Sequence, residues 1–201
     1  MSQLSNVLGQ YDAPQQAKAM GVYPYFRPIQ SDQDTVVTID GKQVDYKLLP
    51  VLAAKSEGEW KRFIQKNKKK LESMDLHVHA HHEAISEKTD CLSCANCCRS
   101  LGPRITDKDV ERISKLLRMK TSELMTKYLR IDEDGDIVFQ SMPCPFLGTD
   151  NYCAIYDSRP KACREYPHTD RKRFYQIYNL SIKNAYTCPI VFEVLEKIKK
   201  F

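Results

Sequence analysis

The sequence lacks the features that would place the protein in a membrane or outside the cell. It has no apolar run approaching the roughly 18 residues that indicate a membrane-spanning helix. Its first ten residues contain no basic region followed by a hydrophobic stretch, so we expect no secretory signal. We therefore expect a cytoplasmic protein without a transmembrane segment.

Cysteine is missing from the first ninety residues. All eight cysteines of the chain lie at or after Cys91. In the cytoplasm, thiols stay reduced unless a metal or a catalytic step uses them. Eight cysteines concentrated in one part of such a chain favour metal ligation over a disulfide framework.

The chain also has only a small excess of positive over negative charge. The 31 lysines and arginines stand against 26 acidic residues, which leaves a net charge of +5. This balance permits loose association with anionic partners but does not indicate nucleic acid. The basic run at 61–70 is expected to be a solvated helix face, because no aromatic residues are interleaved as in a nucleic-acid module. We expect no nucleic-acid partner.

Helical periodicity dominates the chain after residue 47. Apolar residues between 60 and 71 recur on one helical face, and Thr106 with Asp109 is typical of a helix start. Asp40-Gly41 and Asp134-Gly135 are hairpin turns between β-branched or apolar stretches. The sequence predicts an α+β fold that is mostly α-helical, with small β-hairpins and a metal-stabilised cysteine cluster.

Composition divides the chain in two. Residues 1–46 contain no cysteine, and 21–28 is too rich in proline for a helix. We predict an N-terminal arm over 1–46 and a cysteine-cluster metal-binding domain over 47–201. Within that domain, 47–88 is a helical lead-in and 89–201 is the cluster core.

The strongest chemical signal is the run Cys91-Leu92-Ser93-Cys94-Ala95-Asn96-Cys97-Cys98. A Cys-x2-Cys turn brings two sulfurs together, and repeats of this spacing with a remote Cys-Pro are typical of ferredoxin-type clusters. Because Cys98 follows Cys97 directly, the run is not a ferredoxin motif. Adjacent cysteines point in different directions and would not easily ligate one zinc ion.

All eight cysteines are candidate metal ligands, and both zinc and an iron–sulfur cluster use thiolates. They are Cys91, Cys94, Cys97, Cys98, Cys144, Cys153, Cys163 and Cys188. Eight ligands permit two four-cysteine sites, and equally one cluster with four cysteines left for packing or redox roles. Four thiolates around either centre leave a net charge of about −2. Arg159 and Arg164, which bracket Cys163, are expected to offset this charge.

The segments around these cysteines resemble the CxxCxxCC family, also called the YkgJ-type family, over residues 89–195. The matching segments are Cys91-x2-Cys94-x2-Cys97-Cys98, Pro143-Cys144-Pro145-Phe146-Leu147, Cys153-x-Ile155-Tyr156, Arg159-Pro160-x2-Cys163-Arg164-x-Tyr166-Pro167 and Cys188-Pro189. The resemblance implies a zinc- or iron-chelating domain of undefined biochemical role. Flagellin lysine methylases carry a similar cluster, so an iron–sulfur redox or protein-modifying enzyme is the alternative. No Ser-His-Asp arrangement, P-loop or paired-carboxylate site indicates catalysis independently.

The N-terminal arm resembles the leading segment of the α-oxoamine synthases, the PLP enzymes that include serine palmitoyltransferase. The matching residues are 19–27 and 35–42. The resemblance stops before any cofactor-binding part of those enzymes, so it implies no PLP-binding lysine. It suggests a second alternative, in which the protein is an accessory that docks on a serine palmitoyltransferase-like enzyme through residues 1–46.

Overall fold

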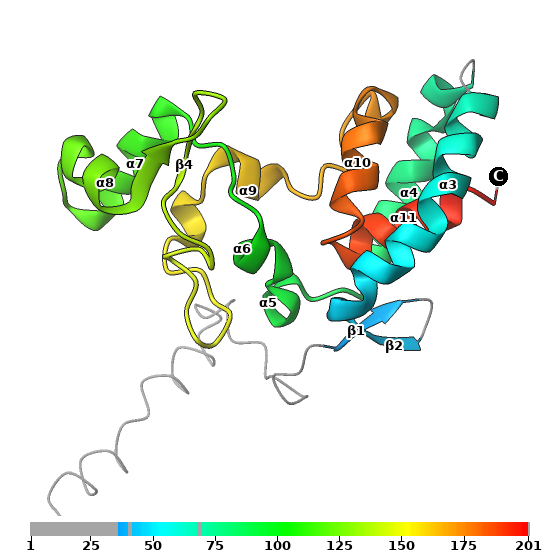
Figure 1. Cartoon of the computed structure of the whole chain (residues 1–201), viewed down its shortest axis with the longest axis horizontal. Helices are drawn as coiled ribbons and strands as arrows, with labels where there is room; N and C mark the ends of the chain where they lie inside the picture. Colours follow the sequence, from blue (N-terminus) through cyan, green and yellow to red (C-terminus); the bar gives the residue numbers. More distant parts are fainter. Residues whose placement is uncertain (1–35, 40–41, 68–69, 201) are drawn as a thin grey trace, which may run out of the picture. The chain divides into compact units, whose positions relative to one another are not determined.

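The computed structural model describes residues 36–39, 42–67 and 70–200 (Figure 1). The chain divides into two compact units, Met1–Asp34 and Thr35–Phe201. The first unit, which contains most of the predicted arm, lies outside the described residues. Within the described ranges, no helix is both long enough and apolar enough to cross a membrane.

The described part is mostly α-helical, as predicted. Its strands are β1 (Val36–Ile39), β2 (Lys42–Asp45), β3 (Leu129–Ile131) and β4 (Ile137–Phe139). Its α-helices are α3 (Leu49–Asn67), α4 (Asp75–Ser86), α5 (Cys91–Cys94), α6 (Asn96–Ser100), α7 (Asp107–Leu117), α8 (Thr121–Tyr128), α9 (Lys161–Glu165), α10 (Tyr178–Asn184) and α11 (Pro189–Ile198). Short 3-10 helices are η1 (Tyr46–Leu48), η2 (Leu71–Met74), η3 (Tyr156–Ser158) and η4 (Phe174–Ile177). The α+β, mostly helical class is confirmed.

Both predicted hairpins form, each as an antiparallel pair. In the first, β1 and β2 pair Ile39 with Lys42, so the chain reverses where the sequence predicts it. In the second, β3 and β4 pair Ile131 with Ile137 across a tight turn. Gly135 takes a φ of 81° in that turn, a backbone conformation that favours glycine.

A first hydrophobic core joins helices from both ends of the described chain. Helix α11 contacts α3, α4 and α10, and the four helices lie together in Figure 1. Trp60 of α3 is fully buried here, its ring packs edge-on against Phe192 at 5.7 Å, and its indole donates to Glu196 Oε1 at 3.0 Å. Two cysteines, Cys94 and Cys188, also belong to this core.

A second hydrophobic core lies around α7, α8 and the β3–β4 hairpin. Phe146 is buried there, and its ring centroid lies 4.9 Å from that of Tyr128 and 5.6 Å from that of Phe139. Cys144 and Cys153 pack against this core as half-buried residues. Each core therefore includes cysteines of its own.

A buried carboxylate joins the start of α7 to the start of α9. Asp109 is 1% exposed and forms a capping box with Thr106. Its Oδ1 accepts from the Arg112 guanidinium and, at 3.0 Å, from the backbone amide of Lys161. Arg112 also donates to the carbonyl of Arg159 at 2.6 Å. The segment that precedes Cys163 is thereby fixed to the second core.

We predict that Asp109→Asn lowers the free energy of unfolding by about 1–3 kcal/mol near neutral pH, because it removes a buried charged acceptor. Burial raises the pKa of Asp109, but hydrogen bonds from Thr106, Arg112 and Lys161 outweigh burial and lower it overall. The ionised carboxylate therefore stabilises the fold above the unfolded pKa of about 4, and this contribution is lost as the pH falls below that value. Denaturant unfolding at several pH values should show the difference between wild type and variant shrinking below about pH 4. An equal difference at all pH values would contradict the account.

Candidate metal centre

The cysteine run folds as two short helical turns joined at one left-handed residue. The Asp90 carboxylate begins α5 by accepting from the amide of Leu92 at 2.9 Å. Ala95, with a φ of 43°, ends α5 and begins α6. Its amide donates to the carbonyl of Cys91 at 2.9 Å. The first turn therefore carries Cys91 and Cys94, and the second carries the adjacent pair Cys97 and Cys98.

Cys97 and Cys98 titrate as an interacting pair. Their Sγ atoms lie 4.0 Å apart. The hydrogen bond from the Cys97 thiol lowers the pKa of Cys98, and the charges of Arg159 and Arg99 lower it further. The same hydrogen bond raises the pKa of Cys97, and burial adds to that rise. Cys98 is therefore the thiol of this pair that ionises first.

Cys188 lies beside the first turn of the run. The Asn96 side chain donates to the carbonyl of Thr187 at 2.8 Å, which holds the residue before Cys188 against the run. Burial raises the pKa of Cys188 to about 12, and the Cys91 and Cys94 thiols add to the rise. Cys188 and Cys91 in turn raise the pKa of Cys97.

The remaining three cysteines lie beside the second turn. The amide of Cys144 donates to the carbonyl of Cys98 at 2.9 Å. Leu147 forms an isolated antiparallel bridge with Cys153, so these segments run side by side. Burial raises the pKa of Cys163 to about 12, and the thiols of Cys98, Cys144 and Cys153 raise it further.

Backbone amides point at four of the sulfurs. Amides two and three residues after Cys144 and after Cys188 donate to those sulfurs, and single amides donate to Cys94 and Cys153. The donors are Phe146, Leu147, Ile190, Val191, Asn96 and Ile155. Each of these hydrogen bonds lowers the thiol pKa, because it stabilises the thiolate, and thiolate is the form that binds metal.

The two predicted arginines occupy different positions. The charge of Arg159 lowers the pKa of Cys91, Cys98, Cys153 and Cys163. Its guanidinium stacks on the Tyr156 ring at 3.5 Å from the centroid. Arg164 instead donates to the carbonyl of Arg159 at 3.1 Å.

Arg99 also lies against the cysteine run. It donates to the Cys94 carbonyl at 2.9 Å and to the Asn151 side chain, and its charge lowers the pKa of both Cys94 and Cys98. Its position directly after Cys98 is the signal in the sequence that points to this role.

Tyr166 is a half-buried residue near the cysteines that the sequence alone did not indicate as part of the site. Its hydroxyl is buried and has no hydrogen-bond partner among the described residues. Burial raises its pKa, and the charges of Cys188 and Cys97 raise it further. The only signal in the sequence is the place of Tyr166 in the Arg164-x-Tyr166-Pro167 segment.

The cysteines are gathered but do not close on one point. All eight are free of disulfides. In ranges 36–39, 42–67 and 70–200, no three histidine, cysteine or acidic side chains are arranged to hold a metal ion as they stand. Metal binding by these thiols therefore requires their side chains to turn toward a shared point.

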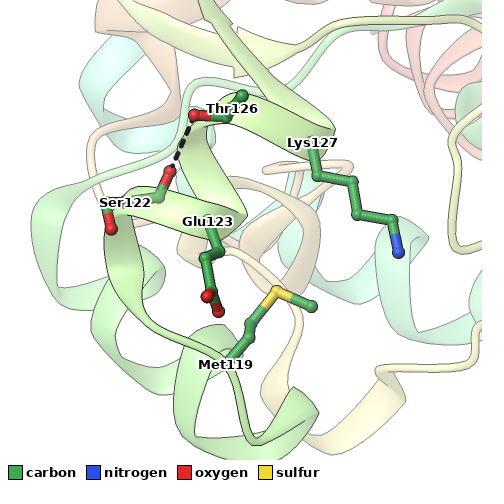
Figure 2. Close-up of a pocket in the computed structure, with 5 residues that line it drawn as sticks. All are labelled: Met119, Ser122, Glu123, Thr126 and Lys127. Carbon is green, nitrogen blue, oxygen red and sulfur yellow. Dashed lines mark hydrogen bonds between the residues drawn. The ribbon is translucent and has the colours of Figure 1, made fainter.

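A hollow in the described residues lies away from the cysteines (Figure 2). It has a volume of about 520 Å³ and is lined by Met119, Ser122, Glu123, Thr126 and Lys127. The Glu123 carboxylate accepts a hydrogen bond from the Lys120 amide at 3.0 Å, so its role is to cap the N-terminus of α8. Because this hollow contains no thiol, it is not part of the candidate centre.

The known proteins that the chain matches include two partial relatives. The chain is 29% identical over 113 residues to an uncharacterized protein of Methanocaldococcus jannaschii, across 55% of this chain and 57% of the relative. It is 51% identical over 41 residues to the serine palmitoyltransferase of Sphingobacterium spiritivorum, across 20% of this chain and 10% of the enzyme. The chain thus spans little more than half of the first relative and a tenth of the second. No solved structure gives a significant match.

A family model matches the part of the chain that carries the cysteines. The matched residues are 90–189, and the family is described as "Putative zinc- or iron-chelating domain". They run from the residue that begins α5 to the residue after Cys188, so they include all eight cysteines. Over these residues, the chain matches the model of the CxxCxxCC family.

Proposed function

We propose that this protein binds zinc or iron through its eight cysteines. The observation that carries the proposal is the convergence of segments far apart in the sequence on the second turn of the cysteine run. The turn around Asn96 reaches Thr187, and the Cys98 carbonyl reaches the amide of Cys144. Packing alone does not require eight reduced thiols at such a junction.

The surroundings of the thiols suit the charge of a thiolate centre. Four thiolates around a divalent zinc ion carry a net charge of about −2, which hydrogen bonds and cations must offset. The backbone amides after Cys144 and Cys188 supply hydrogen bonds, and Arg99 and Arg159 supply positive charge. Burial raises the pKa of most of the thiols, so metal binding has to displace their protons and weakens as the pH falls.

The role that this arrangement supports best is structural. Cys94 and Cys188 belong to the first core, while Cys144 and Cys153 pack on the second. Bound metal would cross-link segments that short helices and loops hold only weakly, and its binding free energy would add to the free energy of folding. A domain over 47–201 with its cluster core at 89–201 is the unit that such metal would stabilise.

The first prediction concerns metal content and stability. Full-length protein purified without oxygen and without a histidine tag should contain zinc, or iron with acid-labile sulfide, as measured by elemental and sulfide analysis. Removal of the metal by a chelator should lower the thermal unfolding midpoint, because metal binds the folded state preferentially. Iron with sulfide would also make redox chemistry at the centre worth testing. Folded protein that contains neither metal, and whose midpoint a chelator does not change, would contradict the proposal.

The second prediction concerns Tyr166. Tyr166→Phe should change metal affinity by roughly tenfold, because groups that contact a ligand tune its affinity by about 10- to 100-fold. Tyr178→Phe is the matched control. The Tyr178 hydroxyl is also buried without a hydrogen-bond partner among the described residues, and burial alone raises its pKa. Chelator competition should separate the two variants. If both variants bind metal with the affinity of the wild type, Tyr166 is not part of the metal site.

A second proposal concerns the arm, and its support is the 51% identity to serine palmitoyltransferase over 41 residues. We propose that the arm over 1–46 attaches the metal-binding domain to an enzyme of that kind. In the described part, the hairpin strand β1 contacts α11, so the end of the arm is joined to the domain.

The third prediction is that deletion of residues 1–34 abolishes co-purification with a serine palmitoyltransferase from the same cell and leaves metal content unchanged. The described elements begin at Val36, so this deletion removes none of them. Equal recovery of the enzyme with and without the arm, or no recovery in either case, would reject this role.

A further inference from the structure

We propose that the eight cysteines form two separate metal centres, with the boundary between the adjacent residues Cys97 and Cys98. The first centre consists of Cys91, Cys94, Cys97 and Cys188. The second consists of Cys98, Cys144, Cys153 and Cys163. This inference rests on the proposed function, which names the ligands but does not divide them.

The first set is held together by contacts to the start of α11. Asn96, which lies between Cys94 and Cys97, donates to the carbonyl of Thr187. Cys188 follows directly and begins α11 as its N-cap residue. Cys94 and Cys188 are buried in the same hydrophobic core, at 7% and 6% exposure. The backbone therefore brings Cys188 to the turns that carry Cys91, Cys94 and Cys97.

The second set is held together by contacts among the segments that carry Cys98, Cys144 and Cys153. The amide of Cys144 donates to the carbonyl of Cys98, so the Cys144 loop pairs with Cys98 directly. The amide of Ala154 donates to the carbonyl of Phe146 at 2.8 Å, which keeps Cys153 beside that loop. Cys144 and Cys153 both pack on the second core.

Cys163 joins this set through α9. The amide of Lys161 at the start of α9 donates to buried Asp109 of α7, and the carbonyl of Arg159 accepts from Arg112. Helix α7 belongs to the second core, so Cys163 is fixed on the same side as Cys144 and Cys153.

Helix geometry explains why the boundary falls inside the adjacent pair. Cys97 and Cys98 lie in α6, where successive side chains point about 100° apart because a turn takes 3.6 residues. Their Sγ atoms lie 4.0 Å apart, and rotation of either side chain about its Cα–Cβ bond carries the two sulfurs toward different points. The pair can then bring two centres close together without either ligand leaving its helical turn.

The test compares metal content in matched variants of the full-length protein. Cys188→Ser should remove the first centre and Cys163→Ser the second, so each variant should keep about half of the wild-type metal per chain. The double variant should keep none. Loss of all metal in either single variant, or no loss in one of them, would overturn the division into two centres.

Two further measurements test the same division if substitution of a buried cysteine prevents folding. Cys91 is exposed and Cys153 half-buried, so Cys91→Ser and Cys153→Ser repeat the comparison at less buried members of each set. Native mass spectrometry of the wild type during chelator titration should show a half-loaded species. A direct step from fully loaded to metal-free protein would contradict two centres.

These outcomes also distinguish failure of the proposed metal binding from failure of the division into two centres. Wild-type protein without metal would remove the proposed function and this inference together. Metal that binds and leaves as a single unit, or that depends on all eight cysteines at once, would overturn only the division into two sets.

Discussion

The structure depends on one constraint, which is that four thiols lie within the eight residues from Cys91 to Cys98. Two short helical turns joined at left-handed Ala95 are how the backbone accommodates this run. Segments from far along the chain attach to the second turn, because Asn96 bonds to Thr187 and Cys98 to Cys144. Both hydrophobic cores contain or contact cysteines of this group, so packing of the cores and gathering of the thiols depend on each other.

The same dependence explains why a metal would act as a structural element here. Buried thiols are costly to ionise, and the raised pKa values of Cys144, Cys163 and Cys188 express that cost. Backbone amides and arginines reduce the cost without removing it. A bound cation would offset the remainder, and it would stabilise only the folded chain, because only folding brings the remote cysteines to the run.

Local sequence patterns predicted the helices and hairpins, whereas the arrangement of the cysteines depends on contacts between residues far apart in the sequence. Thr106 and Asp109 form the capping box that their spacing predicts, and Asp134-Gly135 lies in the predicted hairpin turn. The sequence also identified the CxxCxxCC family, because its cysteine spacings are local and specific. The sequence did not predict which cysteine of the run each remote cysteine approaches. Cys144 comes 46 positions after Cys98, and no local pattern encodes a contact over that distance. The position of Tyr166 depends on how α9 packs, so burial next to Cys188 was not predictable from its neighbours in the chain.

The central claim is that cysteine sulfur holds the metal, and X-ray absorption at the zinc and iron edges tests it most directly. The sample is full-length protein purified without oxygen and without a histidine tag. The account predicts a coordination shell made only of sulfur, at about 2.3 Å for zinc thiolate. A shell of nitrogen and oxygen at about 2.0–2.2 Å would contradict it and would assign the metal to histidine or carboxylate groups instead.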